Sequence, residues 1–456
     1  MLKEAVDYYH SLLEDGELAN ESYRVLHDGL DRARLIFGGR PLSPYLRPHF
    51  ITADDWAHVK ATCEVVWGAL QKVKDAAVEN GAILEELGLT EIERELVKID
   101  PGYRQVSPTS RLDSFLTDDA YSFVELNGES PAGIAYADSA TEIFKSLPVM
   151  QRFMERYEVT GFEGRPKLLE VLLSCWDEFC GGKADRKPVI AIVDLKGLPT
   201  QKEFELFRDY FEFSGYDAVI ASPEELEFVD GRLFLGSLAI DVVYKRLLVN
   251  EYLPIMDQHP ALLDAYRAGA ICMVNSFRGK LVHKKAIFAV LTNERYEHLF
   301  NNAELAAIRE NIPWTRKFRD ERTMNRDEEV DLVEWTRENA LKLVLKPNDD
   351  YGGQGIFIGW NSTAEEWDEA IRTALDNGDY LVQERVSTAK EEFPMVFGGG
   401  MERWSMIEQL VDLDPLLFNG VVGSAFTRLS SSELANVTAG GGMVPTFIIS
   451  KKGSEA

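Results

Sequence analysis

The chain has 456 residues, and its 76 Asp and Glu against 49 Lys and Arg give a formal net charge of −27. This acidity argues against nucleic acid as the main partner, because binding a phosphate backbone needs a basic surface. The hydrophobic fraction of 45% is ordinary for a globular protein, so the charge does not indicate disorder. The length suits two or three domains or one large α/β assembly.

The cysteines and the amino terminus indicate a reducing compartment. The four cysteines, Cys63, Cys175, Cys180 and Cys272, have neither metal-knuckle nor disulfide-framework spacing, and we interpret them as ordinary thiols. Residues 1–22 lack a basic leader and an apolar core, and no stretch approaches the roughly 18 apolar residues of a membrane helix. We therefore predict a soluble cytoplasmic protein with no membrane partner.

The first 180 residues are predicted to be helical on both sides of one hairpin. Apolar residues recur at three- and four-residue intervals up to about Lys98, with Thr52 as a helix cap and three prolines between residues 41 and 48 dividing the region. Two strand-like runs between residues 111 and 131 flank a turn and predict the hairpin. Helical periodicity returns over residues 139–180.

The next block predicts a parallel sheet. Residues 188–222 read as an apolar strand, an amphipathic helix and a second apolar strand, which is a β-α-β pattern. Asp230-Gly231 predicts a hairpin turn, and a further buried strand ends near Arg246. Open α/β sheets bind ligands at the carboxyl ends of such strands, so Arg246 is either a substrate-site candidate or a surface arginine.

A lysine followed by a glycine-rich turn is the most informative local motif. A strand ends at Lys346-Pro347, the turn contains Gly352, Gly353 and Gly355, and a second strand leaves at residue 356. Glycine amides and an ammonium group can surround a polyphosphate. The motif differs from a strand-to-helix phosphate loop, because no Gly-Lys-Ser/Thr occurs. The alternative is a hairpin turn with a surface lysine.

Two further segments fit a nucleotide site. Residues 380–386 read as an apolar strand ending in Gln383 and Glu384, where backbone groups could pair with an adenine edge while Val386 packs on its face. A plain strand end would look the same. Lys284-Lys285 opens a predicted helix, and a lysine near a positive helix end suits a bound phosphate. A solvated basic turn is the alternative.

The hairpin between residues 111 and 131 carries candidate metal ligands. Arg111 and Asp113 differ by two positions, as do Glu125 and Asn127, so each pair projects from one face of its strand and the pairs can converge. Carboxylates and an amide carbonyl are hard oxygen ligands of the type that Mg²⁺ prefers. Arg111 could then neutralise a transferring phosphoryl group, whereas the simpler interpretation is a polar hairpin face.

Together these four motifs resemble the ATP-grasp superfamily, specifically its circularly permuted branch with glutathionylspermidine synthetase and, more distantly, eukaryotic glutathione synthetase. The resemblance is carried by Arg111-Leu112-Asp113 with Glu125-Leu126-Asn127 ahead of a Ser130-Pro131 loop, and it covers much of residues 105–450. It implies an α/β ATP-grasp fold in which the metal ligands precede the glycine lid along the chain. It also implies a Rossmann-like subdomain before the ATP-grasp core.

The resemblance assigns roles to individual residues. It makes Asp113, Glu125 and Asn127 the Mg²⁺ ligands, Arg111 the stabiliser of the γ-phosphoryl group, and Lys285 rather than Lys284 a nucleotide lysine. The second nucleotide lysine is then Lys346, the lid is Gly352, Gly353 and Gly355, and the adenine hinge runs from Gln383 through Glu384 to Val386. Arg428 is a weaker candidate for contacting substrate, and a structural salt bridge is its alternative.

The resemblance also implies a domain organisation and an activity. The predicted parts are a helical region (1–100), a metal-ligand part of the core (101–185), a Rossmann-like subdomain (186–270), a core segment (271–311), the lid subdomain (312–386) and a carboxyl-terminal core part (387–456). The implied enzyme is an ADP-forming carboxylate–amine ligase that uses ATP and Mg²⁺ through an acyl phosphate. Its partners would be a small carboxylate and an amine, such as an amino acid, peptide or polyamine.

Two alternatives remain open from the residues alone. Some ATP-grasp proteins transfer phosphate to a substrate and stop, and their nucleotide residues would look the same. A catalytically inactive nucleotide-binding protein is the other alternative.

Overall fold

A computed structural model describes residues 1–37, 40–350, 352–397, 404–432 and 441–453 of the chain. Its largest sheet has eight strands, with the order β3-β23-β22-β21-β4-β5, while β20 pairs with β21 and β6 pairs with β23. The strands are β3 (His49–Thr52), β4 (Thr109–Leu116), β5 (Tyr121–Asn127), β6 (Tyr157–Thr160), β20 (Ala389–Val396), β21 (Trp404–Phe418), β22 (Val421–Ser430) and β23 (Gly442–Lys451). This central sheet therefore joins segments from both ends of the chain.

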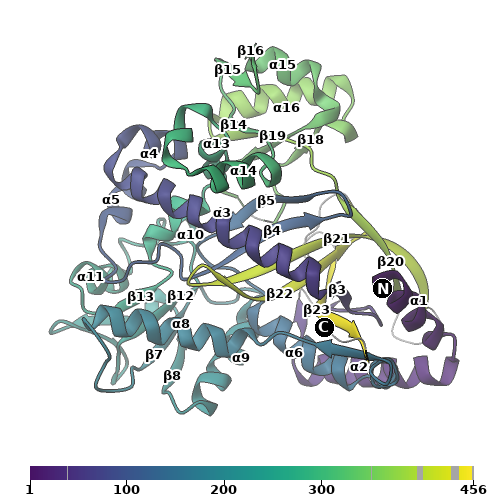
Figure 1. The fold of residues 1–456 in the computed structure, drawn as a ribbon. Coiled ribbons are helices and arrows are strands. Elements are labelled where there is room, and N and C mark those ends of the chain that lie inside the picture. The colour runs from purple at the N-terminus through teal and green to yellow at the C-terminus, as the bar shows by residue number, and fades with distance from the viewer. Residues whose placement is uncertain (38–39, 351, 398–403, 433–440, 454–456) are drawn as a thin grey trace.

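Helices cover the central sheet, and the long helix α3 runs across it in Figure 1. Neighbouring residues Ala425 and Phe426 of β22 belong to two different apolar clusters, because successive side chains of a strand point to opposite faces. The helices of the first 180 residues are α1 (Leu2–Leu13), α2 (Gly16–Arg32), α3 (Ala53–Glu79), α4 (Gly81–Leu87), α5 (Glu91–Lys98), α6 (Ile134–Ser146), α7 (Pro148–Phe153) and α8 (Gly164–Phe179).

The amino-terminal region is less purely helical than its periodicity predicts. The cap at Thr52 is confirmed, since its hydroxyl accepts a hydrogen bond from the Asp55 amide at 3.1 Å. However, β3 pairs in parallel with β23, and β6 pairs antiparallel with the same strand. Each of these short strands is stabilised by a partner about 300 to 400 positions away, which no local pattern reveals. A two-residue pair, β1 (Ile36–Phe37) with β2 (Arg40–Pro41), also lies here.

The predicted parallel sheet is confirmed, with the strand order β13-β12-β7-β8. Its last strand, β13, lies beyond residue 270, where the predicted Rossmann-like part ends. The turn at Asp230-Gly231 has positive φ at both residues and joins β9 to β10. The elements are β7 (Ile190–Val193), α9 (Gln201–Phe213), β8 (Ala218–Ala221), β9 (Leu226–Val229), β10 (Arg232–Leu235), β11 (Leu238–Ile240), β12 (Val242–Lys245), α10 (Val249–Tyr252), α11 (Ala261–Arg267) and β13 (Cys272–Val274).

A third sheet, with the order β14-β19-β17-β18, lies at one end of the molecule under α15 and α16 (Figure 1). The predicted strand–turn–strand unit is confirmed, because β17 pairs antiparallel with β18. The elements from residue 280 onwards are α12 (Lys280–His283), α13 (Ala286–Leu291), α14 (Asn302–Asn311), β14 (Thr315–Lys317), β15 (Arg322–Asn325), β16 (Glu328–Asp331), α15 (Leu332–Glu338), β17 (Leu343–Pro347), β18 (Phe357–Ile358), α16 (Ala364–Asn377) and β19 (Tyr380–Glu384).

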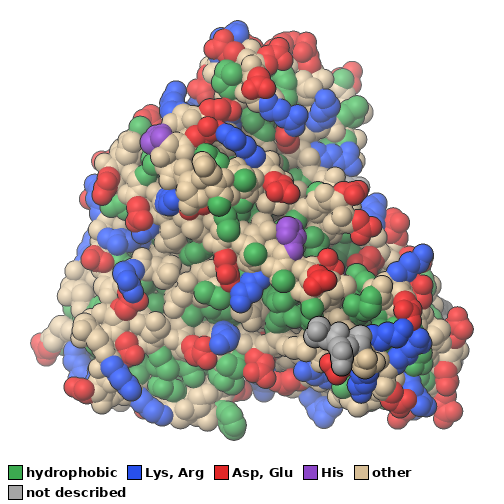
Figure 2. All heavy atoms as spheres, in the orientation of Figure 1, with side chains coloured by type: hydrophobic (Ala, Val, Ile, Leu, Met, Phe, Trp, Pro, Cys, Tyr) green, Lys and Arg blue, Asp and Glu red, His purple; other side chains and the backbone are tan. Residues whose placement is uncertain are grey.

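Charged side chains of both signs lie on the surface of the molecule. On the face shown in Figure 2, acidic and basic side chains are interspersed. Among the described residues, no helix has both the length and the apolar character needed to cross a bilayer.

Candidate active site

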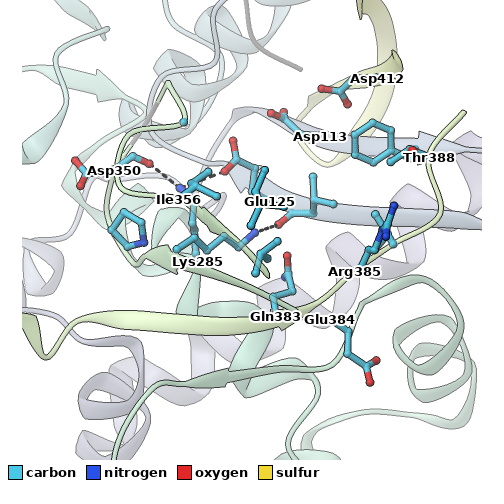
Figure 3. A pocket seen from close by; sticks show the side chains of 18 of the residues that line it. Asp113, Glu125, Lys285, Asp350, Ile356, Gln383, Glu384, Arg385, Thr388 and Asp412 are labelled. Carbon is cyan, nitrogen blue, oxygen red and sulfur yellow. Dashed lines mark hydrogen bonds and ion pairs between the residues drawn. The ribbon is translucent and has the colours of Figure 1, made fainter. Parts of the chain in front are cut away.

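A cavity lined by strands of the central sheet and of the third sheet brings the four predicted motifs together (Figure 3). Of the predicted site residues, those on its walls are Asp113, Glu125, Lys285, Lys346, Gly352, Gly353, Gln383, Glu384 and Val386. Three predicted residues, Arg111, Asn127 and Gly355, are not among the residues that line it. Segments separated by more than 200 positions therefore contribute to one site.

The predicted convergence across the hairpin is confirmed. Arg111 lies opposite Asn127, and Asp113 lies opposite Glu125, in the antiparallel register of β4 and β5. The Asn127 amide nitrogen donates a hydrogen bond to Oδ1 of Asp113 at 2.9 Å. The side chains of the three predicted metal ligands therefore meet, with Asn127 presenting its amide nitrogen to the two carboxylates.

Asp113 is held by two arginines. Arg111 donates to both carboxylate oxygens, at 2.7 and 3.0 Å, and Nη2 of Arg428 donates to Oδ2 at 2.5 Å. Burial opposes ionisation of Asp113, but the charges of Arg111 and Arg428 outweigh it and lower its pKa. With the Asn127 amide, four donors occupy the lone pairs of this carboxylate, so binding a metal would require one donor to move.

Arg111 lies behind the cavity wall. Its side chain is 9% exposed, and its Nη1 donates to the Ala132 carbonyl at 3.0 Å. All three guanidinium nitrogens therefore already have partners in Asp113 and Ala132. In this structure Arg111 orients Asp113, whereas Arg428 is the arginine that lines the cavity. The predicted contact between Arg111 and a phosphoryl group stays a prediction.

Lys285 joins the metal-ligand hairpin to the glycine loop. Its ammonium group lies 3.2 Å from Oε2 of Glu125 and donates to the Asp350 carbonyl at 2.7 Å (Figure 3). Burial favours the neutral form of Glu125, yet the positive charge of Lys285 dominates and lowers the pKa of this carboxyl group. Lys284 points elsewhere, with its ammonium group 2.7 Å from Asp349.

The helix expected to open with these two lysines begins after them. Lys284 and Lys285 lie in the break between α12 and α13, and α13 starts at Ala286. All six residues of α13 are buried, so this helix is enclosed on every side instead of burying one face. A helix of only six residues is too short to attract a phosphate strongly to its amino-terminal end, contrary to the prediction.

Lys346 lines the cavity. Its ammonium group donates to the Val124 carbonyl at 2.8 Å. Burial lowers the pKa of Lys346 to about 8; the charge of Lys285 acts in the same direction, and Glu125 opposes both. Lys346 is therefore mainly protonated at neutral pH and becomes neutral at mildly alkaline pH.

The glycine loop needs its glycines. Gly352, Gly353 and Gly355 have φ values of 71°, 77° and 68°, a region that other residues rarely adopt. A Cβ on Gly355 would come within 2.9 Å of the Tyr380 hydroxyl. Tyr351, just before the first of these glycines, lies outside the described residues.

The root of the loop is fixed to the turn between α12 and α13. The Lys285 amide donates to the Asn348 carbonyl at 3.0 Å. Next to it, the Asp349 carboxylate accepts hydrogen bonds from Lys280 at 2.6 Å and from Lys284 at 2.7 Å. Burial opposes ionisation of Asp349, but these two lysines lower its pKa to about 2. Lys285 and the first residues of the glycine loop are therefore held together.

The predicted adenine hinge forms another part of the wall. The Gln383 side chain donates to the Thr315 hydroxyl at 3.0 Å, and the amides of Glu384 and Arg385 already donate to backbone carbonyls of Trp314 and Lys342. A purine edge would have to use other backbone groups of this segment. The hinge role of Gln383, Glu384 and Val386 stays a prediction.

A buried carboxylate cluster was missed. Asp412 and Asp414 of β21 surround Arg428, which contacts Asp412 directly and donates through Nη2 to Oδ1 of Asp414 at 3.3 Å. Burial raises the pKa of Asp412 to about 7. The positive charge of Arg428 lowers this pKa, and the negative charge of Asp113 raises it further. The sequence does contain a signal: two aspartates at alternate positions interrupt the apolar run over residues 410–418 and place both side chains on one face.

Arg246 is neither a surface arginine nor part of this cavity. It is 3% exposed, donates to the Pro131 carbonyl at 2.7 Å and lies 3.6 Å from Glu203. It therefore links the end of β12 to the loop after β5. Contact between Arg246 and a substrate stays a prediction.

The comparisons with known proteins agree with this architecture. No protein-family model matches the chain. A protein of Frankia casuarinae provisionally named glutamate–cysteine ligase 2-2 is 23% identical over 439 residues, which are 90% of this chain and 47% of that protein. The chain thus spans about half the length of this curated relative.

Among solved structures, the apo form of a glutathione synthetase-like effector from Globodera pallida matches with a TM-score of 0.63 at 14% identity, over 95% of this chain and 98% of that one. A provisionally named gamma-glutamylcysteine synthetase from Methylobacillus flagellatus reaches 0.39 at 8% identity, over 85% and 86%. The fold assignment rests on the Globodera protein. The chain has a mixed α/β fold similar to that of ATP-grasp enzymes.

Proposed function

We propose that the chain is an ATP-dependent carboxylate–amine ligase that releases ADP and phosphate. The observation that carries this proposal is the meeting of Glu125, Lys285 and Lys346 with the glycine loop in one cavity. The similarity to the Frankia protein, whose name describes a carbon–nitrogen ligase, supports the same reaction. The circularly permuted domain order and the closer resemblance to glutathionylspermidine synthetase belong to this proposal as well.

The donor chemistry fits Mg²⁺. Asp113, Glu125 and Asn127 offer hard oxygen ligands from one face of the hairpin, and Glu125 is the more open of the two carboxylates, with 26% of its side chain exposed. The arginine contacts keep Asp113 ionised, which a metal ligand requires. Bound Mg²⁺ would neutralise phosphate charge and orient the nucleotide.

The chain's own residues address an electrostatic problem. A carboxylate must approach the γ-phosphate, and two anions repel each other, so positive charge around them lowers the barrier. Lys285, Lys346 and Arg428 supply that charge from the cavity wall. Carboxylate attack on the γ-phosphorus breaks the bond to ADP; amine attack on the acyl carbon then expels phosphate, and the nitrogen loses a proton. Closure of the glycine loop would keep water from the acyl phosphate.

Amino acids are the first substrates to test. Glutamate and cysteine are named for the Frankia relative, and we propose this pair, or closely related amino acids, as carboxylate and amine. Small peptides and polyamines complete the panel. We propose a cytoplasmic location, where such amino acids and ATP are available.

The test is ADP formation with Mg²⁺ over this panel, for the wild type and for Lys346→Ala and Glu125→Ala. Lys342→Ala is the matched control, because Lys342 is exposed and lies outside the cavity lining. Amine-dependent ADP release that both cavity variants lose supports a ligase. ADP release that needs no amine supports the phosphotransferase, and MgATP binding without turnover supports an inactive binding protein. Normal turnover by both cavity variants would contradict the assignment of the site.

A further inference from the structure

Two carboxylate oxygens in the described part of the buried cluster have no hydrogen-bond donor, Oδ1 of Asp412 and Oδ2 of Asp414, and the first belongs to a residue that lines the cavity. Asp412 is 1% exposed, and its Oδ2 contacts Arg428. Within the described parts of the chain, its Oδ1 is buried and has no partner. Leaving a buried anionic oxygen without a donor is unfavourable, because the oxygen has lost its water without gaining a replacement. This atom is therefore suited to a donor that arrives with a ligand.

The cluster contains more carboxyl groups than guanidinium groups. Oxygen atoms of Asp113, Asp412 and Asp414 lie within 4.8 Å of one another. Arg428 contacts all three carboxylates, and Arg111 adds its charge mainly at Asp113. Burial raises the pKa of both Asp412 and Asp414, so a cationic ligand would stabilise the ionised form of Asp412.

Asp412 and Asp113 are the members of the cluster that line the cavity, and Asp113 already has a donor on each oxygen. The neighbouring Asp414, 0% exposed, is not among the lining residues. Figure 3 shows Asp412 beside Asp113 at one side of the cavity, with Gln383 and Glu384 at another side. A group bound to Asp412 would thus lie beside the candidate metal ligand and away from the predicted adenine hinge.

We propose that Asp412, through its unpartnered Oδ1, binds the ammonium group of the amine substrate. This assignment rests on the proposed ligase function and favours an amine that binds in its ammonium form; the bound ammonium group must release one proton to solvent before its nitrogen attacks the acyl carbon. The ammonium group supplies both a positive charge that stabilises ionised Asp412 and the hydrogen-bond donor that Oδ1 lacks. Asp412 thereby holds the nitrogen next to Asp113 and Arg428, where the acyl phosphate would form.

The experiment compares a charged and an uncharged amine. L-Cysteine carries an ammonium group, whereas hydroxylamine is largely uncharged at neutral pH and gives a hydroxamate when it intercepts an acyl phosphate. With L-glutamate and MgATP, Asp412→Asn should raise KM for L-cysteine about 10- to 100-fold, the loss expected for a charged hydrogen bond. KM for hydroxylamine and for ATP should stay within about twofold of the wild type.

Two further variants separate binding from folding. Asp412→Glu keeps the charge and should restore most of the affinity for L-cysteine. Asp414→Asn removes a carboxylate from the same cluster and should leave the ratio of the two amine KM values unchanged. MgATP binding by each variant reports whether the cavity has folded.

Each other outcome is decisive. Equal rises in both amine KM values, no rise for either, or a shift in the Mg²⁺ dependence alone would overturn the assignment of Asp412. If the wild type forms neither the amide nor the hydroxamate from any member of the panel, the ligase function itself fails, which is a distinct result.

Discussion

The ammonium group of Lys285 lies 3.2 Å from a carboxylate oxygen of Glu125, which joins the segment beside the glycine loop to the hairpin of β4 and β5. Lys285 comes from the break between α12 and α13, and Glu125 comes from β5. MgATP would introduce both a cation for Glu125 and an anion for Lys285. Binding therefore exchanges this internal pair for two pairs with the ligand.

Glu125→Gln should reduce turnover much more than it reduces stability. The variant loses a charged oxygen ligand for Mg²⁺ and leaves Lys285 with a neutral neighbour, so we expect kcat to fall by about 100-fold or more. The measurement is ADP release as a function of Mg²⁺ concentration. Glu365→Gln, an exposed change in the first turn of α16, serves as the control. Unchanged kcat with unchanged Mg²⁺ dependence would exclude Glu125 from the metal site.

Lys346 should give the reaction an alkaline limit. A phosphate contact requires the protonated amine, and its pKa in the free protein is about 8. As the pH rises through about 8 the charge is lost, so kcat/KM for ATP should fall about tenfold per pH unit above that value. Lys346→Arg keeps the charge at high pH and should move this limit upwards. A profile that is flat up to a much higher pH contradicts the assignment.

Asp349→Asn should destabilise the protein by about 2 kcal/mol near neutral pH. The folded pKa of about 2 lies below the ordinary 3.8, so the ionised form contributes stability that is present above about pH 4 and is lost as the pH falls towards 2. Urea unfolding of wild type and variant at several pH values measures this difference. Asp368→Asn, which alters an exposed pair with Arg337, should change stability by less than about 0.5 kcal/mol. A pH-independent difference would contradict the ionic explanation.

Gly355→Ala should distort the glycine loop. The substitution combines a positive φ with a Cβ only 2.9 Å from the Tyr380 hydroxyl. Gly197 is a matched control, since it has φ of 78° but nothing within 4 Å of the point where an added Cβ would lie. Both alanine variants incur the backbone strain of about 1 kcal/mol, but only Gly355→Ala should also raise KM for ATP several-fold. Equal KM values in the two variants would remove the loop from the nucleotide site.

Short-range patterns were enough to find much of the cavity. Asp113 and Glu125 are placed by strand alternation around one tight turn, and Lys346 and its glycines lie within ten residues of one another. Such features depend on the local backbone, whose period can be read directly from the residues. The β-α-β unit that includes β7 and β8 follows from the same kind of pattern.

Tertiary structure alone decided the rest. Whether Arg111 or Arg428 faces the cavity depends on β4 pairing with β21 and on β21 pairing with β22, and the first of these pairings joins residues some 300 positions apart. The charge state of Asp412 depends on the same pairing, because burial beside Asp113 and Arg428 sets its pKa. The sequence by itself determined which residue types were available and on which strand face each would lie. Desolvation and long-range strand register determined which side chains pair with one another and which remain available to a ligand.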